Sequence, residues 1–353
     1  MNFEFSHQAR CISLQIYRFS IEEITKFAAD FSIMKKSAKF ILSALLALLP
    51  ICVFAQAADR YSKVISEGGQ RAIIEHLCDS IMEGRASGSL GGEMAGIYIE
   101  EYFKSLEMKP FQYNDSQTFS SKNGVRMRNI MGVVPALGPC EDFIVVTAHY
   151  DHLGVIKGKV YPGADDNASG VAALLTLADA FTQMRRDSIG PGVNILFVAF
   201  DGKEYSMSGS RHFTATLPIA PSHIICEINM DILGSTLVPV HKNKPEYLIV
   251  LGRNTLPENL RGVISSCNLH KGMGLDIDYT FYGSDDFSKA MYKVGDHYAF
   301  NQKGIPALLF TSGFHQHTLK TSDTPEIIDH KVLLKRTRLI FEVIKEMALR
   351  ARR

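Results

Sequence analysis

The stretch "FVAFDGKEYSMSGSR", residues 197–211, decides how the rest of the chain is interpreted. An apolar run ends in a tight Asp-Gly turn, and the acid Glu204 follows almost directly. Ligands of open α/β sheets gather beyond the carboxyl ends of the strands, so Glu204 stands where an enzyme presents a metal ligand or a catalytic acid. The residue before it, Lys203, is a cation where a metal site would favour a second carboxylate. The stretch therefore raises the question of whether this is an active metallohydrolase or a protein that keeps the fold without the activity.

Apolar segments and amphipathic segments alternate on both sides of this stretch. Their near-continuous Val, Ile and Leu content predicts strands that are buried on both faces, and hence a sheet with a large parallel component. The pattern predicts one α/β domain over residues 58–353, with a mixed, mostly parallel central sheet flanked by helices and a helical lead-in from Tyr61 to about Met108. The predicted strands are 129–136, 142–150, 192–200, 223–232, 246–252 and 305–312, and the predicted helices are 168–184, 208–217, 256–267 and 330–350.

The composition is that of an ordinary globular protein. The chain has 353 residues, of which 46% are hydrophobic and 21% charged, with a formal net charge of +1. Such a balance gives no reason to expect nucleic acid or an anionic membrane as a partner.

Residues 34–57 have the pattern of a secretory signal peptide: a basic start, an apolar run and a small-x-small end at Ala55–Ala57. Residues 1–33 then lie upstream of the true start at Met34. A transmembrane anchor fits less well because the run is short and Pro50 interrupts it. Cys52 invites a lipoprotein interpretation, but the residues before it are not small. We expect a periplasmic or extracellular protein with no stable membrane anchor after cleavage.

Four cysteines remain in the predicted mature chain, without any C-x-x-C pair. In an oxidising compartment they could form one or two disulfides or stay as buried free thiols, and a cysteine zinc site is not expected. They are Cys78, Cys140, Cys226 and Cys267.

Candidate metal ligands stand at the ends of successive predicted strands. Two imidazoles and three carboxylates at one edge of a sheet are the ligand mix expected of a zinc site with open positions, and one carboxylate could bridge two ions. Taken singly, an aspartate could cap the following helix and a histidine could belong to the core. Together they predict a metal site formed by His149, Asp165 or Asp166, Glu204, Asp231 and His317.

The order of these motifs resembles the secreted zinc peptidase family 28, which contains aminopeptidases with two bridged zinc ions and one-zinc glutaminyl cyclases. The resemblance covers roughly residues 65–350. It is carried by "HYD" (149–151), "GADDNASG" (163–170), "FDGKEY" (200–205) followed by "GS" (209–210), "NMD" (229–231) and "HTLKTSDT" (317–324).

The resemblance implies a role for each residue. His149 and Asp231 would hold one zinc, Glu204 and His317 the other, and Asp166 would bridge them next to a cis peptide bond. Asp151 would hydrogen-bond the ligand histidine and fix its tautomer. His315 is a rival to His317, which is preferred for its spacing to Asp323. Tyr292 lies roughly where some aminopeptidases place a tyrosine that donates to the tetrahedral intermediate, although an aromatic residue before a core strand also packs.

Lys203 occupies the position where active relatives carry a glutamate that takes a proton from the attacking water. An ammonium cannot accept a proton, and losing such a base typically costs about 10²–10⁴-fold in rate. Three interpretations stay open: a degenerate site that binds without hydrolysing, a lysine that desolvation and nearby cations turn into a neutral base, or a neighbouring acid such as Asp201 or Asp151 in that role.

The sequence thus predicts an exported zinc aminopeptidase-like protein acting on peptides with a free N-terminus. The alternative is a metal-binding pseudo-peptidase. A glutaminyl-cyclase-like enzyme is disfavoured because His149 is retained and the chain has no tryptophan. Pocket walls would come from loops 235–246 and 269–284, and Ser284 is expected to cap a helix.

Overall fold

The computed structural model describes residues 60–111 and 115–351. The predicted signal peptide, residues 34–57, lies outside this range. Among the described residues, no helix is both long enough and apolar enough to cross a membrane. The four cysteines Cys78, Cys140, Cys226 and Cys267 are free thiols, so the disulfide alternative is not realised.

The sheet is mixed and mostly parallel, as predicted. Its eight strands follow the order β1-β2-β6-β3-β7-β10-β8-β9, and the four central strands β6, β3, β7 and β10 run parallel to one another. The strands are β1 (Ser116–Ser120), β2 (Arg126–Val134), β3 (Phe143–His149), β6 (Asn194–Phe200), β7 (Ile224–Met230), β8 (Tyr247–Leu251), β9 (Asp276–Asp278) and β10 (Ala307–Thr311).

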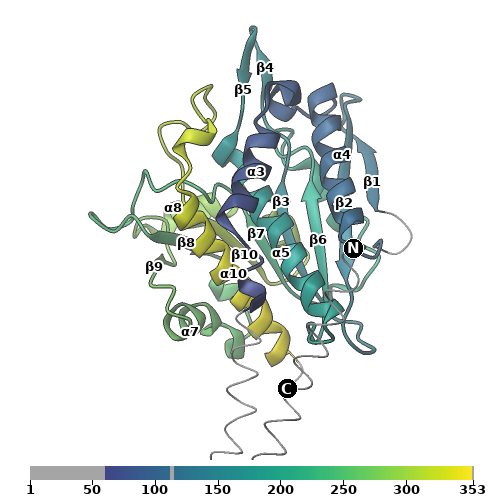
Figure 1. Cartoon of the computed structure of the whole chain (residues 1–353), viewed down its shortest axis with the longest axis vertical. Helices are drawn as coiled ribbons and strands as arrows, with labels where there is room; N and C mark the ends of the chain where they lie inside the picture. The colour runs from purple at the N-terminus through teal and green to yellow at the C-terminus, as the bar shows by residue number, and fades with distance from the viewer. Residues whose placement is uncertain (1–59, 112–114, 352–353) are drawn as a thin grey trace, which may run out of the picture. The chain divides into compact units, whose positions relative to one another are not determined.

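Helices cover both faces of this sheet. On one face α3, α5 and α10 lie side by side, with α4 beside them over β2 and α7 packed against α10 (Figure 1). Phe213 of α6 and Phe300 of α9 pack on the opposite face with Val145 and Phe200. The helices are α3 (Glu67–Leu77), α4 (Leu90–Ser105), α5 (Ser169–Arg186), α6 (Ser208–Ala215), α7 (Val263–His270), α8 (Asp285–Tyr292), α9 (His297–Asn301) and α10 (His330–Arg350).

Local sequence explains where several helices begin. Asp329 accepts a hydrogen bond from the amide of Val332 and starts α10, and Ser66 and Ser89 cap α3 and α4 in the same way. Ser284 caps α8 through the amide of Phe287, which confirms that expectation. The helix predicted over 256–267 is displaced: α7 begins only after Gly262, and a short 3-10 turn precedes it.

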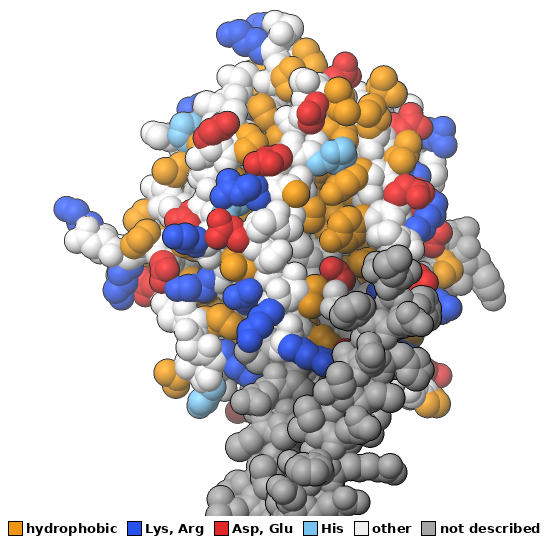
Figure 2. Space-filling model, in the orientation of Figure 1, with side chains coloured by type: hydrophobic (Ala, Val, Ile, Leu, Met, Phe, Trp, Pro, Cys, Tyr) orange, Lys and Arg blue, Asp and Glu red, His pale blue; other side chains and the backbone are white. Residues whose placement is uncertain are grey.

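Four strands, β1, β4, β5 and β9, and the short helix α9 are not among the elements predicted from the sequence pattern. β1 is an edge strand in which Phe119 alone is buried, so its other side chains are polar and give no apolar run. β4 (Gly154–Ile156) and β5 (Lys159–Tyr161) form a short antiparallel hairpin away from the main sheet. On the face in Figure 2, positive and negative side chains are interspersed.

Candidate metal centre

The predicted ligands converge because the central strands are parallel and end together. His149 is the last residue of β3 and pairs in register with Phe200, the last residue of β6. Asp231 directly follows β7, and Glu204 follows β6 after a short turn. Parallel strands present their carboxyl ends at one edge, so residues more than 80 positions apart in the chain meet there.

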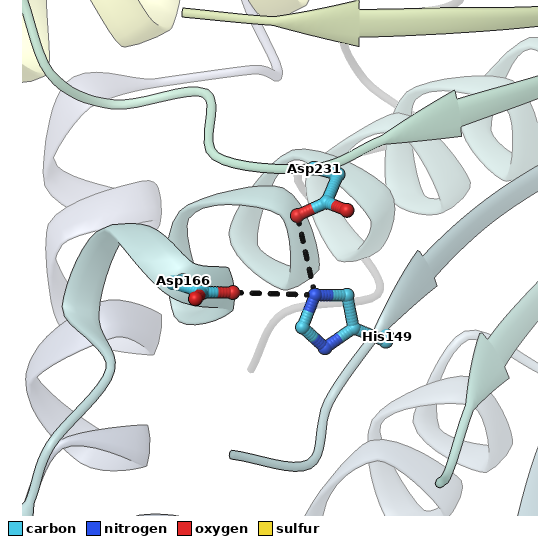
Figure 3. A group of neighbouring side chains, drawn as sticks. All are labelled: His149, Asp166 and Asp231. Carbon is cyan, nitrogen blue, oxygen red and sulfur yellow. Dashed lines mark hydrogen bonds and ion pairs between the residues drawn. The ribbon is translucent and has the colours of Figure 1, made fainter. Parts of the chain in front are cut away.

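The centre of the site is a buried imidazole approached by two carboxylates. Asp166 Oδ1 lies 3.4 Å and Asp231 Oδ1 3.2 Å from Nε2 of His149. Figure 3 shows both carboxylates directed at this one nitrogen, Asp166 from the turn before α5 and Asp231 from the loop after β7. His149 is fully buried. These three residues form one of two groups in the described chain whose ligand atoms lie close enough to hold a metal ion.

Backbone contacts hold the aspartate loop in place. The peptide bond between Asp166 and Asn167 is cis, as the resemblance implies. The Asn167 side chain donates to the carbonyls of His149 and Met230 and accepts from the amide of Ile232. It therefore joins the ends of β3 and β7 to the loop that carries Asp166.

Asp165, the alternative to Asp166 as a metal ligand, makes contacts outside the centre. Its carboxylate accepts from the amides of Gly234 and Ser235, at 2.6 and 3.1 Å. His315 Nε2 lies 3.0 Å from the same carboxylate. The structure thus directs Asp166 into the centre and Asp165 toward the loop after β7.

The carboxylate of Asp151 anchors the turn that carries Lys203 and Glu204. Its two oxygens accept from the amides of these residues at 3.0 and 3.1 Å. Nδ1 of His149 lies closer to the Asp151 carbonyl oxygen, at 3.1 Å, than to its carboxylate, at 3.8 Å. Asp151 therefore orients the histidine mainly through its backbone, which differs from the carboxylate contact that the resemblance implies.

Lys203 turns into the centre rather than toward solvent. Its ammonium lies 2.8 Å from Asp231 Oδ2, and the two side chains are 16% and 11% exposed. Asp231 consequently has one oxygen facing His149 and the other facing Lys203.

Electrostatics favour the charged form of this pair. Burial lowers the pKa of Lys203, but the carboxylates of Asp231, Asp296 and Asp166 outweigh it and raise the pKa above its ordinary value. Burial raises the pKa of Asp231, yet Lys203 and His149 hold it well below its usual range. These directions weigh against the interpretation in which Lys203 is a neutral base.

The other proposed bases are already engaged. Asp201 is buried and accepts from Ser87 Oγ, the amide of Arg128 and the hydroxyl of Tyr150. Burial and the charge of Asp201 raise the pKa of Asp151 to about 7, despite the opposing charge of His149. Because both acids hold backbone in place, neither is free to move toward a substrate without releasing it.

The partly exposed Glu204 belongs to the second candidate group, with Asp166 and His152. His152 is buried, and burial lowers its pKa to about 4 although Asp166 opposes the shift. Sequence reasoning missed this histidine. The available signal was its place directly after the "HYD" motif, three residues beyond the end of β3.

His317 belongs to neither of the two groups of described residues that could hold a metal ion. Nδ1 of His317 lies 2.9 Å from Ser322 Oγ, and Nε2 lies 3.2 Å from the Gln316 side chain. Tyr292 also lies elsewhere: its hydroxyl donates to the carbonyl of Ala307, the first residue of β10. That is the opposite end of the strand from the metal centre, so Tyr292 packs rather than faces the site.

Known proteins resemble this chain in sequence and in fold. The model of peptidase family M28 matches residues 129–344. A probable zinc metalloprotease of Leptosphaeria maculans is 28% identical over 245 residues, which are 59% of this chain and 54% of the relative. The chain thus spans about half the length of that relative.

Two solved structures share the fold. A zinc aminopeptidase from Bacillus subtilis superposes with a TM-score of 0.63 at 14% identity, covering 80% of this chain and 95% of the other. A glutaminyl cyclase from Porphyromonas gingivalis gives a TM-score of 0.62 at 18% identity, covering 80% and 98%.

Proposed function

The chain belongs to peptidase family M28, and from this premise we propose that it is an exported, zinc-dependent, aminopeptidase-like protein. It binds the free N-terminus of a peptide and removes the first residue slowly. The observation that carries the proposal is the buried His149 imidazole with Asp166 and Asp231 directed at its Nε2.

The donor set of this centre fits zinc. Imidazole nitrogens and carboxylate oxygens are both zinc ligands, and a site with three protein ligands leaves a position open for a substrate. Asp166 presents its two oxygens to different sides, and Glu204 stands beside it, so the same residues offer room for a second ion. Zinc held by these residues would supply Lewis-acid chemistry for peptide hydrolysis.

The neighbouring cavity suggests which N-terminal residues bind. A narrow cavity of about 30 Å³ adjoins Lys203 and Asp231 and is otherwise lined mainly by apolar side chains. These include Phe281, Met291 and Phe314. An apolar first residue would leave no polar group unpaired there, so we expect hydrophobic first residues to be preferred.

Lys203 limits the chemistry of this site. Its ammonium donates to Asp231 and accepts no proton from a water molecule, so the proton transfer that a glutamate would perform has no obvious acceptor. The same ion pair favours a second candidate function, a pseudo-peptidase that binds peptides without turnover.

Turnover of aminoacyl and peptide substrates in the presence of zinc tests the proposal. The panel includes hydrophobic, acidic and basic first residues and an N-terminal glutamine, which reports cyclisation. We expect slow release of hydrophobic residues and an increase of about 10²–10⁴-fold in Lys203→Glu. Lys242→Glu, a change of an exposed lysine, is the matched control. Zinc uptake without turnover in either protein would favour the pseudo-peptidase, and absence of zinc uptake would refute the metal centre.

Export is the part of the proposal supported by residues 34–57 alone. We expect the secreted or periplasmic fraction to contain a protein whose N-terminus lies near Ala58. N-terminal sequencing of that fraction checks this, and retention of residues 34–57 would contradict it.

A further inference from the structure

His152 lies beside the centre and has no hydrogen-bond partner for its ring among the described residues. It is 1% exposed, and neither of its ring nitrogens makes a hydrogen bond within the described residues. Buried polar side chains nearly always have a partner, so an orphaned imidazole needs an explanation. Neutral histidine is the commonest metal ligand in proteins, so a metal ion is one partner that would satisfy this imidazole.

The groups around His152 are the ligands that such an ion needs. Nδ1 of His152 lies 3.9 Å from Asp166 Oδ2. One ligand atom from each of His152, Asp166 and Glu204 lies within 4.8 Å of the other two. The other oxygen of Asp166 faces His149 at 3.4 Å. The carboxylate thus stands between two imidazoles, which is the arrangement of a bridging ligand.

The loop at Gly163 and the buried Arg85 hold the His152 ring in place. Gly163 has a φ of +61°, and a Cβ on it would lie 2.5 Å from Cγ of His152, so only glycine lets the loop approach the ring. The fully buried Arg85 donates to the Gly163 carbonyl, and the amide of His152 donates to the Arg85 carbonyl. These contacts preorganise the ring, as a metal ligand requires.

The histidines of the C-terminal loop are engaged elsewhere. His315 faces Asp165, and His317 lies between Ser322 and Gln316. Neither belongs to a group of described residues that could hold an ion.

We propose that His152 is a metal ligand which completes, with Asp166 and Glu204, the second position of the centre in place of a C-terminal histidine. The ligand set of one nitrogen and two carboxylates suits zinc or a similar divalent first-row cation. The inference rests on the proposed function, because Asp166 is shared with the position at His149 and Asp231.

Zinc titration of the whole metal-free chain tests the assignment, with bound metal measured by elemental analysis and cobalt(II) spectra as a second readout. We expect His152→Ala to lose one bound ion, or to weaken the second binding step at least about 10-fold, a loss typical of changes at a metal site. His317→Ala, the matched control, is expected to bind like the unmodified chain. His152→Gln serves as a second variant, and urea unfolding verifies that each protein is folded.

The outcomes separate this inference from the proposed function. Unchanged zinc binding in both His152 variants, or loss of an ion in His317→Ala, would overturn the assignment of His152 while leaving the centre intact. Absence of zinc binding by the unmodified chain would overturn the proposed function and this inference together. Loss of one ion in both His152 variants but not in His317→Ala supports the assignment.

Discussion

Replacing Lys203 by methionine should destabilise the metal-free protein, because it leaves Asp231 without its ammonium partner. The pair is 2.8 Å apart and mostly buried. Removing one partner of a buried ion pair typically costs about 3–5 kcal/mol, much of it from the charge left behind. His149 still faces the other oxygen of Asp231 at 3.2 Å, so we expect the lower end, about 3 kcal/mol in the free energy of unfolding.

Urea unfolding without metal measures this loss, and Lys335→Met is the control. Lys335 pairs with Glu246 at 2.6 Å, but the two side chains are 30% and 49% exposed. Exposed ion pairs contribute only about 0–1 kcal/mol to stability, so Lys335→Met should change the free energy of unfolding little. If the two variants differ by less than about 0.5 kcal/mol, the ammonium is not the counter-ion of Asp231 and the reasoning fails.

Zinc provides the second arm of the same experiment. A cation at the centre replaces the missing ammonium, so zinc should stabilise Lys203→Met more than it stabilises the unmodified chain. A ligand at 100 times its dissociation constant adds about 2.7 kcal/mol, which is enough to measure. Equal stabilisation of both proteins by zinc would show that Lys203 does not compete with the metal.

Two further predictions concern the frame of the site and the core behind it. Gly163→Ala should destabilise the protein by several kcal/mol, well beyond the about 1–2 kcal/mol expected for Gly158→Ala, as measured by urea unfolding. Both glycines have positive φ, but a Cβ at 163 meets Asp166 O at 2.4 Å and one at 158 meets nothing within 4 Å. Burial lowers the pKa of His297 to about 3, despite the opposing charge of Asp231, whereas the unfolded chain gains this proton near pH 6.5. The unfolded state therefore binds one more proton between these values, so stability falls by about 1.4 kcal/mol per unit as pH drops below 6.5. His297→Gln should remove that part of the slope in unfolding curves at pH 7, 6 and 5, and an unchanged slope would contradict the assignment.

The central sheet was predictable because its strands are buried on both faces. β3, β6 and β10 show nearly continuous apolar runs, and β7 does so apart from Glu227 and Asn229. The positions of His149 at the end of β3 and of Asp231 just after β7 follow from the parallel arrangement. An edge strand such as β1 gives no such signal, since most of its side chains face solvent.

The site was only partly predictable, because spacing does not reveal how loops turn. His317 has a plausible spacing to Asp323, but Leu319 between them takes a left-handed conformation, with φ of +58°, and His317 bonds locally. His152 directly follows the "HYD" motif, but its position beside Asp166 depends on the close approach of Gly163, a contact between loops that residue spacing does not reveal.

The retention of the ligands does not by itself argue for catalysis, because their frame is built from neighbouring acids. Asp323 accepts from the amides of Asp165 and Asp166, and Asp151 accepts from the amides of Lys203 and Glu204. The donors of these bonds are backbone amides of the ligand loops. The bonds therefore do not depend on which side chain stands at position 203.

A lysine could therefore replace a glutamate at position 203 without disturbing the turn that carries Glu204. The Asp151 carboxylate would accept from the same two amides in either case. The change would alter only the interactions of the side chain at position 203 with Asp231 and with the reacting groups. Lys203→Glu therefore keeps the amide contacts of the turn, but in the metal-free protein it places a second carboxylate beside Asp231. Its turnover is therefore measured with zinc present, and urea unfolding verifies that the variant is folded.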